Sequence, residues 1–284
     1  MFATLLMIAL AGPVAPGELE VDTIVPDRFE AHELELFRID RLALRDPHLF
    51  VEVEVFGFPV CVDATDPNDD FDAPSFNGIV DATLNEDGSG DGNLDESPLL
   101  VFQPRGWPGG SGALALGDGE CTAPAETTTC SLVDTGPRGW FDNRDDAGLC
   151  RGALPDTPSD QNYQPPIPEI EAPCFATHPA PVSIDLADLA LELAGASVSG
   201  SWTQLAGERI DPGQLRGFLS EADAEAIIIP EDIDIIGGQP LASLLPGGDG
   251  NCAAHDDRDE FGGETGWWFY FDVGAERPAG TRDW

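Results

Sequence analysis

The fold class is decided by the stretch Trp267-Trp-Phe-Tyr-Phe-Asp-Val273. It is apolar at alternate and at intervening positions, which suits a β-strand buried on both faces. Residues 99–102 are apolar in the same way and predict a second central strand. Within residues 37–55, valines alternate with glutamates over 51–55 and predict a strand with one solvated face. These patterns predict an all-β protein.

Short strands separated by turns rich in Gly, Pro and Asp extend this pattern along the chain. Further strands are expected at residues 76–84, 113–116, 182–184, 189–202 and 214–219. Ser220 is a suitable N-cap for a short helix over 220–226, and a second short helix is expected at 241–245. The sequence therefore predicts either a β-sandwich or two related small β units, with one or two short helices.

Six prolines lie between residues 151 and 174, a density that precludes a helix or a central strand. Residues 151–174 are expected to be a linker or a strap between a first β unit at 28–150 and a second at 175–284. A weak internal repeat supports two related units. In it, Gly78, Val80, Leu84 and Glu86 match Gly213, Leu215, Leu219 and Glu221 in spacing.

The chain is strongly acidic. Its 284 residues include 53 Asp and Glu against 13 basic residues, all arginine, for a net charge of −40. Nucleic acid and anionic lipid are excluded as partners, because both are negative. The charge favours divalent cations and cationic partners. With 42% hydrophobic residues, the chain can still bury a core.

Residues 2–11 form an apolar run that ends in Ala9-Leu10-Ala11. The run is too short to cross a bilayer, so no membrane insertion is expected. It is typical of a secretory signal peptide at 1–11, although no basic residue precedes it; a buried N-terminal strand is the alternative. The signal predicts a secreted protein, periplasmic or extracellular.

The six cysteines agree with export, because none is spaced as C-x-x-C and their number is even. They predict three disulfides. Cys121 and Cys130 bracket a short Thr-rich segment and would close a local loop. Cys150 and Cys174 bracket the proline-rich segment, which leaves Cys61 and Cys252 as the third pair.

The most specific chemical motif lies between residues 85 and 98, where oxygen donors alternate with glycines. Asp87, Ser89 and Asp91 fall at positions 1, 3 and 5 of an EF-hand-type loop, Asn93 at position 7 and Asp95 at position 9. We predict that these five residues bind calcium. A Gly- and Asp-rich turn that binds nothing is the alternative.

This segment resembles the calcium loops of EF-hand, dockerin and thrombospondin type 3 proteins. Gly92 stands at position 6, where such a loop turns sharply. The resemblance fails at position 12, where Pro98 replaces the bidentate glutamate. The predicted affinity for calcium is therefore weak to moderate.

Two further candidate sites have less support. Trp107, Trp140, Trp202, Trp267 and Trp268 would form a carbohydrate platform if their rings were exposed in one row, but aromatic residues in strands are usually core. His255-Asp256-Asp257 would suit a zinc hydrolase, but zinc needs three or four convergent ligands and the histidines are scattered. No catalytic residue is identified.

The expected function is that of a secreted, calcium-stabilised structural or binding protein of the cell exterior. Its expected partners are divalent cations, with glycans or cell-surface proteins as further candidates. A carbohydrate-binding module is the alternative, and a secreted hydrolase is the third possibility.

The chain also resembles an uncharacterised family of secreted bacterial β proteins. The resemblance rests on Asp46-Pro-His48, on the loop at 87–98, and on Gly247-Gly-Asp-Gly-Asn-Cys-Ala-Ala-His-Asp-Asp-Arg258 followed by Gly266-Trp-Trp-Phe-Tyr-Phe271. It implies export and a shared β fold. It supplies neither an activity nor catalytic residues.

Overall fold

The structure is a computed structural model that describes residues 34–67, 75–103, 110–145, 148–158, 166–186, 189–203, 209–231 and 236–281. All of these residues belong to one unit, Glu33–Trp284. The predicted signal peptide at 1–11 lies outside the described residues. None of the helices in the described ranges has the length and apolar character needed to cross a membrane.

The strands are β1 (Glu35–Asp46), β2 (Phe50–Val55), β3 (Phe58–Asp63), β4 (Pro98–Gln103), β5 (Ser111–Cys121), β6 (Thr129–Arg144), β7 (Leu149–Arg151), β8 (Ile170–Glu171), β9 (Cys174–Thr177), β10 (Ala180–Leu186), β11 (Leu189–Thr203), β12 (Arg209–Ser220), β13 (Asp259–Phe261), β14 (Glu264–Glu276) and β15 (Gly280–Thr281). The helices are α1 (Phe76–Asn85) and α3 (Glu221–Ala226), with short 3₁₀ turns η1 (Ala125–Thr127) and η2 (Leu241–Leu244).

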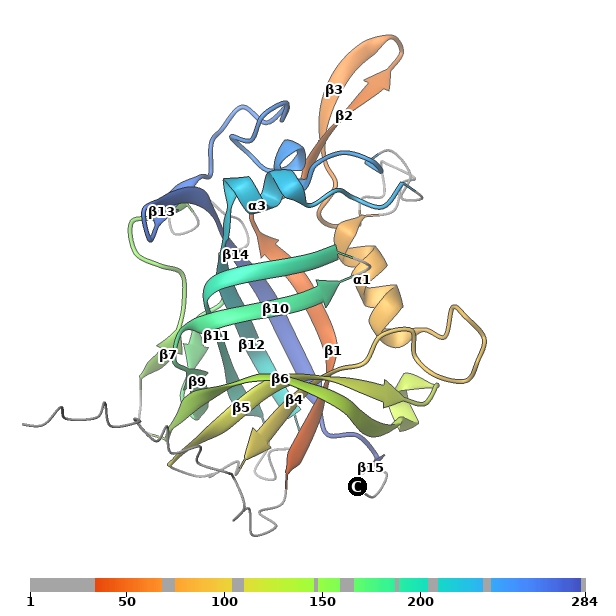
Figure 1. Ribbon diagram of the computed structural model, residues 1–284, viewed down its shortest axis with the longest axis vertical. Coiled ribbons are helices and arrows are strands. Elements are labelled where there is room, and N and C mark those ends of the chain that lie inside the picture. The colour runs from red at the N-terminus through yellow and green to blue at the C-terminus, as the bar shows by residue number, and fades with distance from the viewer. Residues whose placement is uncertain are drawn as a thin grey trace, which may run out of the picture. The chain divides into compact units, whose positions relative to one another are not determined.

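The main sheet is antiparallel and closes on itself (Figure 1). Its described strands follow the order β1-β4-β5-β6-β9-β11-β12-β14, and β14 pairs back onto β1, with Leu42 opposite Val273. The all-β prediction is confirmed. Strands from both sides of the proline-rich segment belong to this one closed sheet.

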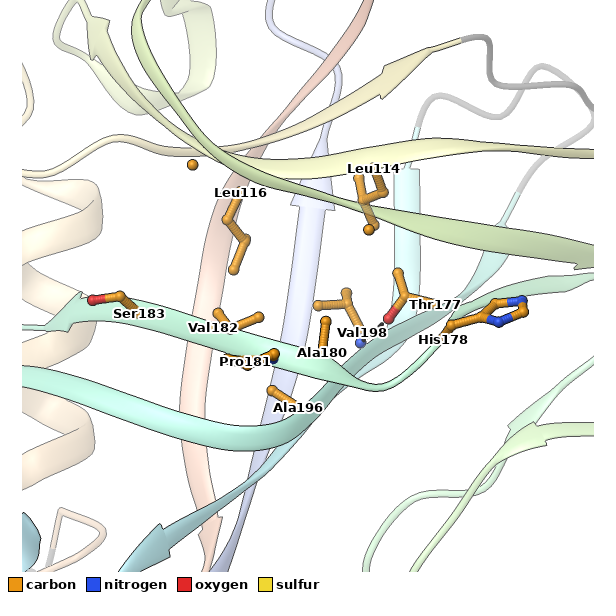
Figure 2. A pocket seen from close by; sticks show the side chains of 12 residues that line it. Leu114, Leu116, Thr177, His178, Ala180, Pro181, Val182, Ser183, Ala196 and Val198 are labelled. Carbon is orange, nitrogen blue, oxygen red and sulfur yellow. Dashed lines mark hydrogen bonds between the residues drawn. The ribbon is translucent and has the colours of Figure 1, made fainter. Parts of the chain in front are cut away.

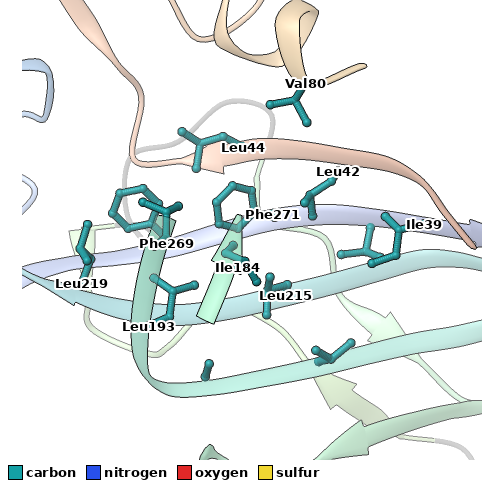
Figure 3. Packing of buried hydrophobic residues seen from close by; sticks show 14 of the residues in the cluster. Ile39, Leu42, Leu44, Val80, Ile184, Leu193, Leu215, Leu219, Phe269 and Phe271 are labelled. Atoms are coloured by element: carbon teal, nitrogen blue, oxygen red, sulfur yellow. The ribbon is translucent and has the colours of Figure 1, made fainter. Parts of the chain in front are cut away.

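The stretch at 267–273 lies in β14 and is buried on both faces, as predicted. Trp267, Phe269 and Phe271 point into the main core, where Figure 3 shows both phenylalanines beside side chains of β1 and β12. Trp268 and Tyr270 belong to an outer cluster beneath the proline-rich segment. Successive side chains of β14 point to opposite faces of the sheet and therefore pack into two separate hydrophobic clusters.

One part of the interior of the closed sheet is filled by aromatic rings. The Phe102 ring centroid lies 5.3 Å from that of Phe141, 5.1 Å from that of Phe175 and 5.4 Å from that of Trp202. Phe37 adds an edge-to-face contact at 5.6 Å. The quadrupoles of the rings favour edge contacts of this kind, so these side chains form a rigid aromatic cluster.

Residues 76–84 form a helix, so the predicted strand is wrong. Ser75 caps α1 by accepting a hydrogen bond from the Gly78 amide at 3.1 Å. Val80 and Leu84, one turn apart, bury the same face of the helix. The predicted repeat between 78–86 and 213–221 is wrong for the same reason, because the first segment is helical and the second lies mainly in β12.

The short helix after Ser220 is confirmed as α3, with Ser220 accepting a hydrogen bond from the Asp223 amide. The second helical segment is the 3₁₀ turn η2. All three predicted disulfides are present: Cys61–Cys252, Cys121–Cys130 and Cys150–Cys174. They indicate an oxidising, extracytoplasmic environment.

Candidate functional site

The candidate site lies where the closed sheet opens between β6 and β10. Strand β9 pairs with both β6 and β11, whereas β10, which follows β9, pairs only with β11 among the described strands. The β10–β11 hairpin therefore diverges from β6. Figure 2 shows the resulting gap, with Leu114 and Leu116 facing Val182 and Val198.

Two adjacent pockets lie in this gap. The larger, called here the main cavity, has a volume of about 230 Å³, and the smaller side pocket has a volume of about 70 Å³. Both are lined by Leu116, Gly136, Ser183 and Val198.

The floor of the main cavity is aliphatic and comes from strands far apart in the sequence. It consists of Ile39, Leu42, Leu100, Ile184, Leu215 and Val273. Gly117 on β5 and Gly136 on β6 also line the cavity, and at these positions only backbone forms the wall. The cavity is thus open to solvent on one side, and its floor belongs to the main core.

The mouth of the main cavity is acidic. Asp118 and Asp134 are partners across β5 and β6, and Asp185 lines the cavity from β10. All three side chains are exposed, and none forms an ion pair with a residue that the structure describes. An aliphatic floor therefore meets a negative rim that forms no ion pair with any described residue.

Polar side chains also line the two spaces. His178, at the side pocket, contacts Asp142 with 3.0 Å between Nε2 and Oδ2, but both side chains are about two-thirds exposed. The Thr177 hydroxyl accepts a hydrogen bond from the Val198 amide at 2.8 Å. Among the described lining residues, no nucleophile is hydrogen-bonded to a base.

The predicted calcium loop folds around two of its carboxylates. Asp87 accepts hydrogen bonds from the amides of Gly90, Asp91 and Gly92, at 2.7, 3.1 and 2.9 Å. Asp95 accepts from the amides of Gly88 and Ser89. The bond from Gly92 is the leading reason why the pKa of Asp87 lies below its ordinary value.

The remaining predicted ligands stay at the surface or turn toward the backbone. Asp91 accepts a hydrogen bond from the Asn93 amide at 2.8 Å, and the Ser89 hydroxyl lies 3.3 Å from Asp87. Within the described ranges, no group of three His, Cys, Asp or Glu side chains is arranged to hold a metal ion. The hydrogen bonds from the loop amides to Asp87 stabilise its charged form.

The tryptophans do not form an exposed row in the part of the chain that is described. Trp202, Trp267 and Trp268 are buried, Trp140 is 66% exposed, and Trp107 lies outside the described residues. These positions give a carbohydrate platform no support.

A polar cluster at the base of the β2–β3 hairpin brings together residues that the sequence left apart. The Nδ1 atom of His48 lies 2.6 Å from Asp63, and the Nε2 atom of His255 lies 3.3 Å from Asp257. The ring centroid of Phe50 lies 6.4 Å from that of His48 and 5.4 Å from that of His255.

The surroundings of these side chains shift their pKa values. The hydrogen bond with Asp63 raises the pKa of His48 above its ordinary value. Burial raises the pKa of Asp257 to about 6. The cluster therefore holds two groups, His48 and Asp257, whose pKa values are both raised.

Sequence reasoning missed the cavity residues, because an aliphatic side chain in a strand looks the same whether it fills a core or borders a void.

Comparisons with family models, curated proteins and solved structures found no match to this chain.

Proposed function

We propose that this protein is an exported binding protein that holds a small apolar molecule in the main cavity. The observation that carries the proposal is the aliphatic void of about 230 Å³ in the core, open between β6 and β10. An apolar cavity of about 150 Å³ can hold benzene, so this one suits a ligand of roughly one ring with a short chain. Burial of such a ligand contributes about 25 cal/mol per Å² of apolar area.

The rim favours a ligand with a positive group. Asp118, Asp134 and Asp185 surround the mouth, and the whole chain carries a net charge of −40. A cationic amine attached to an apolar body would bury the body in the cavity and leave the amine among these carboxylates. The field of the chain would also speed its approach.

Isothermal titration calorimetry with phenethylamine tests this proposal. Val198 lines both spaces and is 5% exposed, so Val198→Phe should place a larger ring in the space that the ligand needs and abolish binding. Val133→Phe is the matched control, because Val133 is 65% exposed. The proposal fails if wild type does not bind phenethylamine, or if Val198→Phe binds it as wild type does.

Calcium binding by the loop at 87–98 is a second candidate function, supported by a different observation. Gly92, at the turn position of the loop, has a φ of 92° and donates its amide to Asp87. This conformation strongly favours glycine, and it agrees with the turn expected at position 6. We propose that calcium stabilises this loop through oxygen atoms of Asp87, Asp91 and Asp95. To bind it, Asp87 and Asp95 would turn away from the loop amides whose hydrogen bonds they accept.

A further inference from the structure

A third pocket lies on the outer face of the closed sheet, beside the proline-rich segment. It has a volume of about 660 Å³, and two arginines, Arg151 and Arg216, line it. Its apolar walls come from Leu149, Leu154 and Ile167, with prolines beside them. It shares no lining residue with the main cavity or the side pocket.

Backbone carbonyls and an aromatic ring hold the two guanidinium groups. Arg151 donates to the carbonyl oxygen of Thr177 at 2.7 Å and to that of Cys150 at 3.2 Å. Arg216 donates to the carbonyl oxygen of Gly152 at 3.3 Å, and its guanidinium carbon lies 5.6 Å from the ring centroid of Trp268. The Nε atom of each arginine is buried and lacks a hydrogen-bond partner.

The two arginines lack the carboxylate partner that most described arginines of this acidic chain have. Neither forms an ion pair with a described carboxylate, whereas six others do: Arg38, Arg41, Arg45, Arg209, Arg258 and Arg277. Glu169 also lines the pocket, but it is exposed and pairs with neither arginine.

The local electrostatics agree with an unbalanced positive site. Burial, followed by repulsion from Arg216 and Arg144, lowers the pKa of Arg151. Burial also lowers the pKa of Arg216, against the opposing effect of Tyr270. Two arginines that line one pocket without a described counter-ion favour the binding of an anion there.

We propose that this pocket binds a small organic anion, a carboxylate with an apolar body. The carboxylate would pair with the guanidinium groups of Arg151 and Arg216, which match its planar geometry. The apolar body would lie against Leu154, Ile167 and the other apolar walls. An inorganic anion would use the arginines and leave these walls in water.

Calorimetric titration with hexanoate tests the site, with hexanol and inorganic phosphate as comparison probes. Wild type should bind hexanoate at least tenfold more tightly than either of them. Arg151→Gln should weaken hexanoate binding by at least tenfold. Arg277→Gln removes the same charge at an exposed position and should leave binding unchanged.

A second variant separates a loss of binding from a loss of folding. Arg216→Lys keeps the charge above Trp268 but removes the planar donor pair, and it should weaken hexanoate binding without changing the near-ultraviolet circular dichroism spectrum. Val198→Phe should not affect hexanoate binding, so this site and the main cavity are tested separately. Equal binding of hexanol or phosphate, or full binding by Arg151→Gln, would overturn the inference.

Discussion

Asp118 and Asp134 face each other across β5 and β6 at the mouth of the main cavity. Like charges in directly paired positions are destabilising in a sheet, and no described residue forms an ion pair with either carboxylate. Asp185 lines the same mouth from β10. The arrangement costs stability in the free protein and would favour a cation at this position.

The first prediction concerns these carboxylates. Asp118→Asn together with Asp134→Asn should weaken phenethylamine binding about fivefold, because an exposed ion pair contributes up to about 1 kcal/mol. Binding of phenethyl alcohol should stay the same, since it uses only the aliphatic floor. Calorimetry of both ligands measures the difference. Asp249→Asn, an exposed aspartate outside the mouth, is the control. An equal loss for both ligands would contradict the role of the rim.

The second prediction is a pH dependence at Asp257. Its pKa of about 6 in the folded protein exceeds the unfolded value of about 3.9, so ionisation costs stability as the pH rises from about 4 to about 6. Above that window the full cost remains. Asp257→Asn should therefore raise the Tm at pH 8 and leave it nearly unchanged at pH 4. A lower Tm at pH 8 would show instead that the contact with His255 outweighs burial.

The third prediction concerns calcium. Calcium at ten times its Kd would stabilise the folded protein by about 1.4 kcal/mol. The Tm should therefore rise in millimolar calcium beyond the rise in NaCl of equal ionic strength. Asp87→Ala with Asp91→Ala should abolish that excess and keep the general salt effect, whereas Asp249→Ala should keep both. An identical response of wild type to the two salts would reduce the loop to an acidic turn.

The fourth prediction concerns the Cys61–Cys252 disulfide, which joins residues 191 positions apart and fixes the β2–β3 hairpin to the segment before β13. A cross-link over a loop of this length restricts the unfolded chain by about 5 kcal/mol. Cys61→Ala with Cys252→Ala should lower the free energy of unfolding by up to that amount in urea titrations. An unchanged urea midpoint would mean that the disulfide contributes nothing to global stability.

Burial and local caps could be predicted from the sequence. The five consecutive aromatic residues at 267–271 identified a strand buried on both faces, and Ser220 identified the start of α3. The disulfides followed from cysteine spacing, because two pairs are local and the third remained. Each of these inferences needed only neighbouring residues or simple counting.

Closure of the sheet and the cavity could not be predicted in this way. Pairing of Leu42 with Val273 depends on contacts across more than half of the chain, which no local pattern encodes. The helix α1 was missed because Val80 and Leu84 suit one face of a helix as well as an apolar strand. The divergence of β10 from β6 depends on tertiary packing. Only this divergence decides which aliphatic residues line the cavity and which fill the core.

The central claim, that the aliphatic void in the core is a binding site, is tested most directly by diffraction from crystals pressurised with xenon. Xenon binds in apolar cavities, so a peak is expected at the aliphatic floor, among Leu42, Leu116 and Val198. Phenethylamine soaked into unpressurised crystals should occupy the same position with its amine near Asp134. In Val198→Phe both peaks should vanish. Xenon and phenethylamine absent from this cavity in the wild type would contradict the proposed function.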